Sequence, residues 1–283
     1  MTVAARKLKL ERVGPKAWKF ECAPEEYRLM DKFDSGVDLL EAGNEGEAEK
    51  IFRVLIRAWP LHIDARHHLA LLLLGRGELT AALDLWGKAA EIGLRSLPTE
   101  FVMGEDKLEW ICLENRPFLR AYHGLGFALF DAGRVEAAHL IYNHLLAMNP
   151  NDNQGVRSLA VESGFAMHRP AEALRICNKY KGDVLVDSLY GRPLALWQLG
   201  KKTLAEKALI NAIALSPLVA RELVKKRHQA PKSAGLAYIT VGGADEAYEY
   251  WQRLGKYWKE TEGALAFVSE VLARFQTKHP VQH

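Results

Sequence analysis

The chain has 283 residues, of which 49% are hydrophobic, and its 38 basic and 35 acidic residues leave a formal net charge of +3. This length exceeds that of one ordinary compact domain, so it predicts either two domains or one elongated array. The near balance of charge gives no general electrostatic reason for binding to nucleic acid or to an anionic membrane. The expected partner is neutral or of mixed charge.

The cysteines, the N-terminal sequence and the longest aliphatic run bear on the cellular compartment of the protein. Cys22, Cys112 and Cys177 form no CxxC pair, which argues against a disulfide framework or a cysteine zinc site and favours reduced thiols. The N-terminal sequence up to Trp18 is basic but lacks the apolar core of a signal peptide. The longest aliphatic run, Leu69 to Leu74, is far shorter than the roughly 20 residues that span a bilayer. We therefore expect a cytoplasmic protein with no membrane segment.

An internal repeat runs through the chain, and small residues mark it. Helices that cross closely need small residues at the crossing, because larger side chains would hold them apart. A first set of positions recurs after 34 residues, and a second set recurs after 67 residues, or about two repeats. The first set is Gly43, Ala48 and Phe52, which return as Gly77, Ala82 and Trp86; the second is Gly133, Ala138 and Pro150, which return as Gly200, Ala205 and Pro217.

The clearest unit, residues 119 to 150, predicts a helical hairpin. Apolar residues follow helical spacing on both predicted helices, and Gly126 is the expected position of closest contact. The segment 131 to 134 makes the turn. Asn149 and Pro150 end the second helix, because proline disfavours a helical conformation in the residue before it.

The same frame divides the chain into five hairpins, more than the three or so that such stacking needs. The fourth hairpin has His168-Arg169-Pro170 in place of a glycine turn. An insertion follows the second hairpin, and its Phe101, Leu108, Trp110 and Ile111 predict that it packs back onto the repeats. The predicted order is an N-terminal segment 1–28; units one and two within 29–94 (29–60 and 63–94); the insertion 95–116; units three to five within 117–217 (119–150, 154–185 and 186–217); and a C-terminal region 218–283, with helices through Arg227, near 245–259 and near 261–276.

The period and the small-residue pattern resemble those of the tetratricopeptide repeat. The resemblance implies an all-α fold, a right-handed superhelical solenoid of helical hairpins with a C-terminal helical cap. A narrower resemblance covers residues 114 to 162 and 242 to 268, which look like bacterial tetratricopeptide proteins related in pattern to the suppressor-of-tumorigenicity-seven family. The segment NPNDNQGVR, Asn149 to Arg157, is its most specific part.

The resemblance also implies a binding surface, because the first helix of each tetratricopeptide hairpin lines a concave groove. The residues at groove-facing repeat positions are largely aromatic with a few charges, which suits an apolar or amphipathic peptide. The alternative is that these aromatic residues pack against the insertion or the C-terminal helices and never meet a ligand. The predicted groove residues are His67, Arg120, His123, Phe127, Phe130, Glu162, Phe165, Tyr190 and Trp197.

Motifs of catalysis are not found in the sequence. The histidines do not form an HExxH arrangement, and neither a GxSxG elbow nor a GxxxxGK[ST] phosphate loop occurs. The groove positions also lack the lysine and asparagine of a carboxylate clamp. We therefore predict no catalytic residue, no cofactor and no metal.

The leading hypothesis is a protein-interaction scaffold or adaptor that binds a peptide or helix of a partner in the groove. The alternative is an RNA-associated or enzyme-associated accessory protein that acts through the basic and aromatic C-terminal region, from Lys225 to Lys232 with Trp251, Tyr257 and Trp258. Nucleic-acid binding is disfavoured because aromatic residues are not interleaved with the basic ones. Self-association through an exposed face is a third possibility. The sequence leaves the partner and the oligomeric state open.

Overall fold

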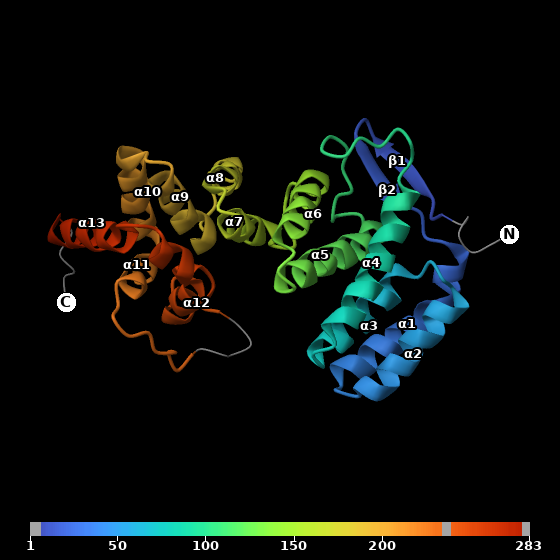
Figure 1. Cartoon of the computed structure of the whole chain (residues 1–283). Helices are drawn as coiled ribbons and strands as arrows, with labels where there is room; N and C mark the ends of the chain where they lie inside the picture. Colours follow the sequence, from blue (N-terminus) through green and yellow to red (C-terminus); the bar gives the residue numbers. More distant parts are fainter. Residues whose placement is uncertain (1–6, 234–238, 279–283) are drawn as a thin grey trace. The chain divides into compact units, whose positions relative to one another are not determined.

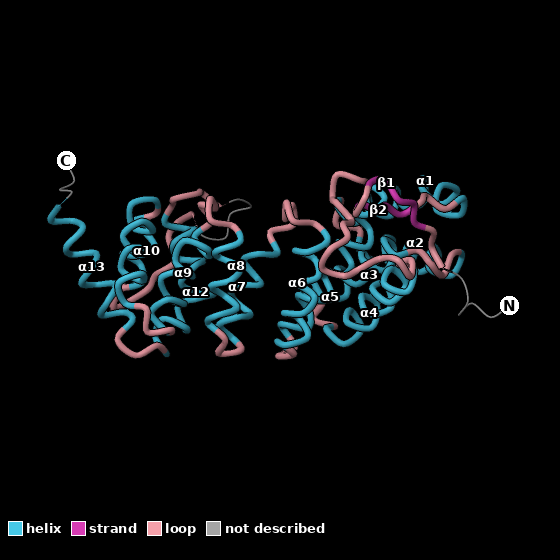
Figure 2. Tube along the Cα trace, turned by 90° about the horizontal axis from the view of Figure 1, so that it is seen from above, coloured by secondary structure: helices cyan, strands magenta, loops and turns pink. Residues whose placement is uncertain are grey.

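The computed structural model describes residues 7–233 and 239–278, and most of these residues are helical (Figure 1). Thirteen helices, α1 to α13, follow one another along the described chain, and the two strands lie near its N-terminal end (Figure 2). The predicted all-α class of helical-repeat solenoid is confirmed. The chain divides into two compact units, Met1–Val156 and Arg157–His283, and each has buried hydrophobic residues of its own.

The N-terminal unit contains three helical hairpins. In each, a residue with positive φ joins the two helices: Gly43, Gly77 or Gly133, at φ between 74° and 79°. Glycine adopts this left-handed conformation at little cost, and it commonly ends a helix for that reason. The hairpins are α1 Pro24–Glu41 with α2 Glu45–Ala58, α3 Ile63–Gly75 with α4 Leu79–Ser96, and α5 Arg116–Asp131 with α6 Val135–Met148.

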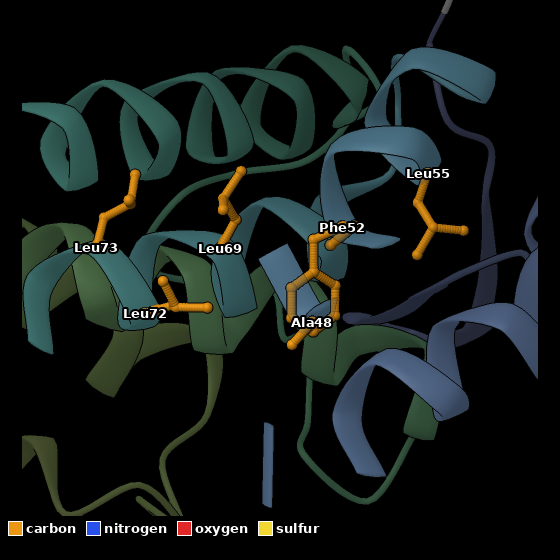
Figure 3. Packing of buried hydrophobic residues seen from close by; sticks show 7 residues of the cluster. Ala48, Phe52, Leu55, Leu69, Leu72 and Leu73 are labelled. Carbon is orange, nitrogen blue, oxygen red and sulfur yellow. The ribbon is translucent and has the colours of Figure 1, made fainter. Parts of the chain in front are cut away.

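Apolar side chains from successive hairpins form the core of the N-terminal unit. Phe52 and Leu55 of α2 belong to one buried cluster with Leu69 and Leu72 of α3, and Figure 3 shows Phe52 between Leu55 and Leu69. Phe52 and Leu55 are fully buried. The predicted close contact at Gly126 is confirmed, because a Cβ atom there would lie 2.8 Å from the Tyr142 ring. Small residues thus allow the helices to pack at the distance that the core requires.

The N-terminal segment forms a β-hairpin that the sequence analysis did not predict. Strand β1 Leu10–Gly14 pairs antiparallel with β2 Ala17–Phe20. The insertion lies along the other side of β2, where Trp18 N donates to Lys107 O at 2.9 Å. The buried Asn115 side chain donates to Trp18 O and accepts from Phe20 N. Helix α1 also begins before the predicted residue 29.

The insertion packs back onto the repeats, as predicted. Leu108 is fully buried, and its backbone N–H donates to Met148 O at 3.0 Å. A short 3-10 helix, Leu113–Asn115, leads into α5. The prediction is wrong for Ile111, which is 78% exposed. The insertion is therefore anchored by a few buried residues and backbone hydrogen bonds.

The C-terminal unit contains two further hairpins and three helices. His168, at φ 54°, takes the left-handed turn position of the first hairpin, and Gly200 takes it in the second. The basic helix expected to continue through Arg227 ends at Leu223; beyond it Lys225 and His228 both contact Glu222. The elements are α7 Val156–Ala166 with α8 Pro170–Lys179, α9 Val186–Gln198 with α10 Lys202–Leu215, then α11 Pro217–Leu223, α12 Ala244–Glu260 and α13 Ala264–Lys278.

Two glycines of α4 provide a matched test of this packing. A Cβ atom at Gly93 would lie 2.0 Å from the buried Phe118 ring, whereas one at Gly87 would meet nothing within 4 Å. We expect Gly93→Ala to lower the free energy of unfolding by about 1–3 kcal/mol, because the ring must move within a packed core. Gly87→Ala should raise it by up to about 1 kcal/mol through helix propensity. Urea unfolding of both variants measures the difference, and equal effects would contradict the packing described.

Candidate functional site: a pocket between helices α3 and α5

The first helices of two neighbouring hairpins, α3 and α5, enclose a pocket of about 280 Å³ in the N-terminal unit, here called the α3/α5 pocket. Four of the predicted groove residues line it together: His67, Arg120, His123 and Phe127. Leu71 and Phe127 are 42% and 46% exposed, so they offer apolar surface to a ligand. The full lining is His67, Leu71, Leu74, Trp86, Arg120, His123, Gly124, Phe127 and Gln154.

Trp86 of α4 closes the inner side of the pocket. Its indole Nε1–H donates to His67 Nδ1 at 3.0 Å, which makes Nδ1 the acceptor of the neutral imidazole. Gly124 lets α5 approach the indole, because a Cβ atom there would lie 2.5 Å from the ring. Trp86 is not among the residues predicted from the sequence to line the groove. Its signal in the sequence is the repeat position that it shares with the core residue Phe52.

The charges of the pocket are neutralised within the unit. Arg120 forms two hydrogen bonds to the Asp64 carboxylate, Nη2 to Oδ2 at 2.5 Å and Nε to Oδ1 at 3.3 Å. Burial lowers the pKa of His67 well below its usual value, and burial also lowers the pKa of His123. Both imidazoles are therefore neutral near pH 7. The pocket therefore presents apolar and neutral polar surface, and the charge of Arg120 is paired with that of Asp64.

The remaining predicted residues lie elsewhere. Phe130 is half-buried on α5 and does not line the pocket. In the C-terminal unit, Phe165 and Tyr190 are 2% and 0% exposed. Phe165 packs on Tyr257 of α12, and Tyr190 packs on Tyr250 of the same helix.

The prediction that Glu162, Phe165, Tyr190 and Trp197 face an open groove is therefore corrected. Glu162 is buried and binds Arg253 of α12, with Nη2 to Oε2 at 2.8 Å. Trp197 stacks on Phe267 of α13 at 4.2 Å between ring centroids, and its Nε1–H donates to Glu262 O. Helix α12 covers Glu162, Phe165 and Tyr190, and α13 packs on the half-buried Trp197, because burying apolar surface in water is favourable. Thus the alternative reading, packing against the C-terminal helices, holds in this unit.

Comparison with known proteins assigns the chain to a family. Residues 18–282 match the family model described as "Transcriptional repressor TCF25". The chain belongs to the TCF25 family. A search of curated proteins finds no match. The matching family is not described as a family of enzymes.

Solved structures show which fold this TCF25-family chain shares. YrrB, a TPR protein with an unusual peptide-binding site, is 14% identical with a TM-score of 0.51, over 70% of this chain and 94% of YrrB. MamA is 16% identical with a TM-score of 0.50, over 71% and 97%. A tetratricopeptide repeat protein from Parabacteroides merdae is 14% identical with a TM-score of 0.50, over 88% and 86%. The repeats therefore have the tetratricopeptide fold.

In the TCF25-family chain, the NPNDNQGVR segment connects elements by hydrogen bonds. Asn149 Oδ1 accepts from Trp110 N at 3.2 Å, and Gln154 Nε2 donates to Leu119 O at 3.2 Å. Asp152 Oδ1 accepts from Val156 N at 2.7 Å, at the start of α7. Arg157 pairs with Asp183 within the C-terminal unit. All four side chains thus stabilise the fold, and Gln154 also lines the α3/α5 pocket.

The C-terminal aromatic residues of the TCF25-family chain do not form an exposed stacking surface. Trp251, Tyr257 and Trp258 are 7%, 5% and 0% exposed. The Trp251 ring stacks on His228, and Trp258 Nε1–H donates to the Tyr250 hydroxyl. Bases bind to aromatic faces that solvent reaches. This part of the RNA-associated alternative is therefore corrected.

Two features of the part of the TCF25-family chain that the structure describes bear on metal and membrane binding. No group of three or more His, Cys, Asp or Glu side chains in that part is arranged to hold a metal ion. No single helix there is long and apolar enough to cross a membrane, although α10 and α11, joined by a 114° bend, pass that test of length and composition as a pair.

A buried histidine at the start of α3 makes the stability of the N-terminal unit depend on pH. His62 is 3% exposed, and its Nδ1 accepts from Ala65 N at the start of α3. Burial lowers the pKa of His62 from 6.5 to about 4. Between these values the unfolded chain binds a proton at His62 and the folded chain does not. The free energy of unfolding should therefore fall as the pH falls from 6.5 to 4, by at most about 3 kcal/mol.

Urea unfolding at pH 7 and pH 4.5 measures this dependence. The variant His62→Asn keeps a side-chain acceptor at the helix start and removes the titrating group. It should lose less stability between the two pH values than the original protein does. His67 contributes in the same direction, so a residual dependence is expected. An identical loss in both proteins would contradict the role assigned to His62.

Proposed function

We propose that the chain is a protein-interaction scaffold that holds a peptide or helix of a partner protein in the α3/α5 pocket. The observation that carries this proposal is the convergence of His67, Arg120, His123 and Phe127, from two successive repeats, around one open pocket. Two apolar side chains at its mouth, Leu71 and Phe127, are each more than two-fifths exposed. Such side chains gain free energy when a partner covers them.

The size and charge of the pocket favour a macromolecular partner. Small-molecule sites usually span roughly 300–1,000 Å³, and the pocket of about 280 Å³ lies at the lower end of that range. A pocket of this size can take one or two anchoring side chains of a larger partner. Because Arg120 is already paired with Asp64, an uncharged anchor fits best. Burial of one such side chain contributes about 1.5–3 kcal/mol.

The family description bears on the cellular process in which the partner acts. Since the chain belongs to a family described as a transcriptional repressor, we infer that the partner acts in the control of transcription. The formal charge of +3 gives little support for direct DNA contact, so binding of a protein partner is the favoured mode of action. The resemblance to the suppressor-of-tumorigenicity-seven group and the cytoplasmic location remain predictions.

Affinity capture with matched variants tests the scaffold role. Leu71→Asp/Phe127→Asp places two charges at the exposed mouth of the pocket and should leave the fold intact. Leu140→Asp is the control, because Leu140 of α6 is 55% exposed and does not line the pocket. We expect captured proteins to be lost with the double variant and retained with the control. Circular dichroism verifies that both are folded.

Quantitative mass spectrometry of the captured proteins provides the readout. A decrease of at least about tenfold with the double variant corresponds to the loss of about 1.4 kcal/mol of binding. If the same proteins are captured at the same level by all three forms, the α3/α5 pocket is not the working surface and the proposal fails.

A further inference from the structure

The C-terminal unit contains an example of a helix bound to the first helices of two successive repeats. Helix α12 lies against α7 and α9, and its side chains Tyr250, Arg253 and Tyr257 face them. Tyr257 packs on Phe165, and Tyr250 packs on Tyr190. Arg253 reaches both helices, with Nη2 at 2.8 Å from Glu162 Oε2 and 3.2 Å from Asp187 Oδ1. The spacing of the three residues places them on one face of α12.

The left-handed turn residues align this surface with the α3/α5 pocket. In the two surfaces, α7 and α3 are the earlier of the paired first helices, and α9 and α5 are the later ones. Glu162 of α7 lies six residues before His168, and Leu71 of α3 lies six before Gly77, so the two residues occupy equivalent places. The acid that Arg253 binds on the earlier helix of one surface is replaced by an exposed leucine in the other.

The second acid has a counterpart whose charge is already paired. Asp187 of α9 lies thirteen residues before Gly200, and Arg120 of α5 lies thirteen before Gly133. In the C-terminal unit the cation for Asp187 comes from the docked helix. In the N-terminal unit the equivalent residue is itself a cation, and it is paired with Asp64. A docked cation at this place would therefore meet Leu71 and Arg120 and no carboxylate at either position.

We propose that the occupant of the α3/α5 pocket is an amphipathic α-helix of a partner protein that places an uncharged apolar side chain where α12 places Arg253. This inference rests on the proposed scaffold function and specifies the class of partner. Both surfaces are built from first helices of successive repeats, and a helix of 17 residues such as α12 is about 25 Å long. That length spans two packed helices, whose axes lie about 8–10 Å apart.

Charge complementarity distinguishes this occupant from α12 of a second copy. The α12 helix of a second copy would bring Arg253 against Leu71 and Arg120, where the desolvated guanidinium would lack a carboxylate and would face a like charge. A buried donor left without a partner weakens binding, and a charged donor weakens it more. The pocket therefore favours helices whose central anchor is Leu, Met or an aromatic residue.

A displayed library of helices tests the inference on the full-length protein. The library is built on the sequence of residues 244–260, with the positions of Tyr250, Arg253, Leu254 and Tyr257 randomised. We expect selected helices to carry apolar residues at the position of Arg253. The unaltered 244–260 peptide should bind at least about tenfold more weakly than a selected helix. Fluorescence anisotropy measures both affinities.

Two variants of the protein make the result specific. Leu71→Asp/Phe127→Asp should abolish binding of the selected helices, whereas binding at any other surface would persist. Leu71→Glu restores the acid found at Glu162 and should shift the preference toward Arg at the position of Arg253. Selection of cationic helices by the original protein, or no change in preference with Leu71→Glu, would overturn the inference.

The scaffold proposal and this inference fail in different ways. If a parallel library of extended peptides yields binders that depend on Leu71 and Phe127 while the helix library yields none, the helical occupant is wrong and the scaffold proposal stands. If neither library yields a binder that the double variant loses, both are wrong.

Discussion

The left-handed residue between the two helices of each hairpin is the constraint on which the rest of this structure depends. Gly43, Gly77, Gly133, His168 and Gly200 all have positive φ, which reverses the chain within a few residues. The second helix then packs against the first, and small residues such as Gly126 allow close approach. Because the turn occupies a fixed place in every repeat, residues at a fixed distance before it lie on equivalent faces of the first helices.

The same backbone arrangement thereby supports two different surfaces. In the C-terminal unit, Glu162 and Asp187 are buried carboxylates that would be costly without a cation, and Arg253 of α12 supplies it. The carboxylates outweigh the effect of burial, so the pKa of the Arg253 guanidinium lies above its ordinary value. In the N-terminal unit Arg120 neutralises Asp64 from within. In the C-terminal unit, α12 of the same chain supplies the cation that the surface needs. In the N-terminal unit, the charged side chains are already paired with each other, and the side chains at the mouth of the pocket are apolar.

The sequence predicts the hairpins better than it predicts what covers them. The recurrence of glycine and alanine identifies the five hairpins, because those positions are fixed by turn conformation and close helix contact. The β-hairpin was missed because β1 and β2 are only five and four residues long and are stabilised by pairing with Lys107 and Asn115, far along the chain. Likewise, periodicity shows that α12 is amphipathic but not which helices its apolar face covers.

In the α3/α5 pocket, too, the residues set by repeat position could be predicted from the sequence, whereas the contacts made by distant side chains could not. His67, Arg120, His123 and Phe127 were selected by repeat position and line one pocket, since repeat position depends only on helix register. Repeat positions give no information on Trp86, whose indole closes the pocket from the second helix, or on the two hydrogen bonds between Arg120 and Asp64. Those depend on side-chain rotamers and long-range packing. The neutrality of the pocket follows from these contacts, and it is this property, more than the number of aromatic residues, that limits which partner side chains the pocket accepts.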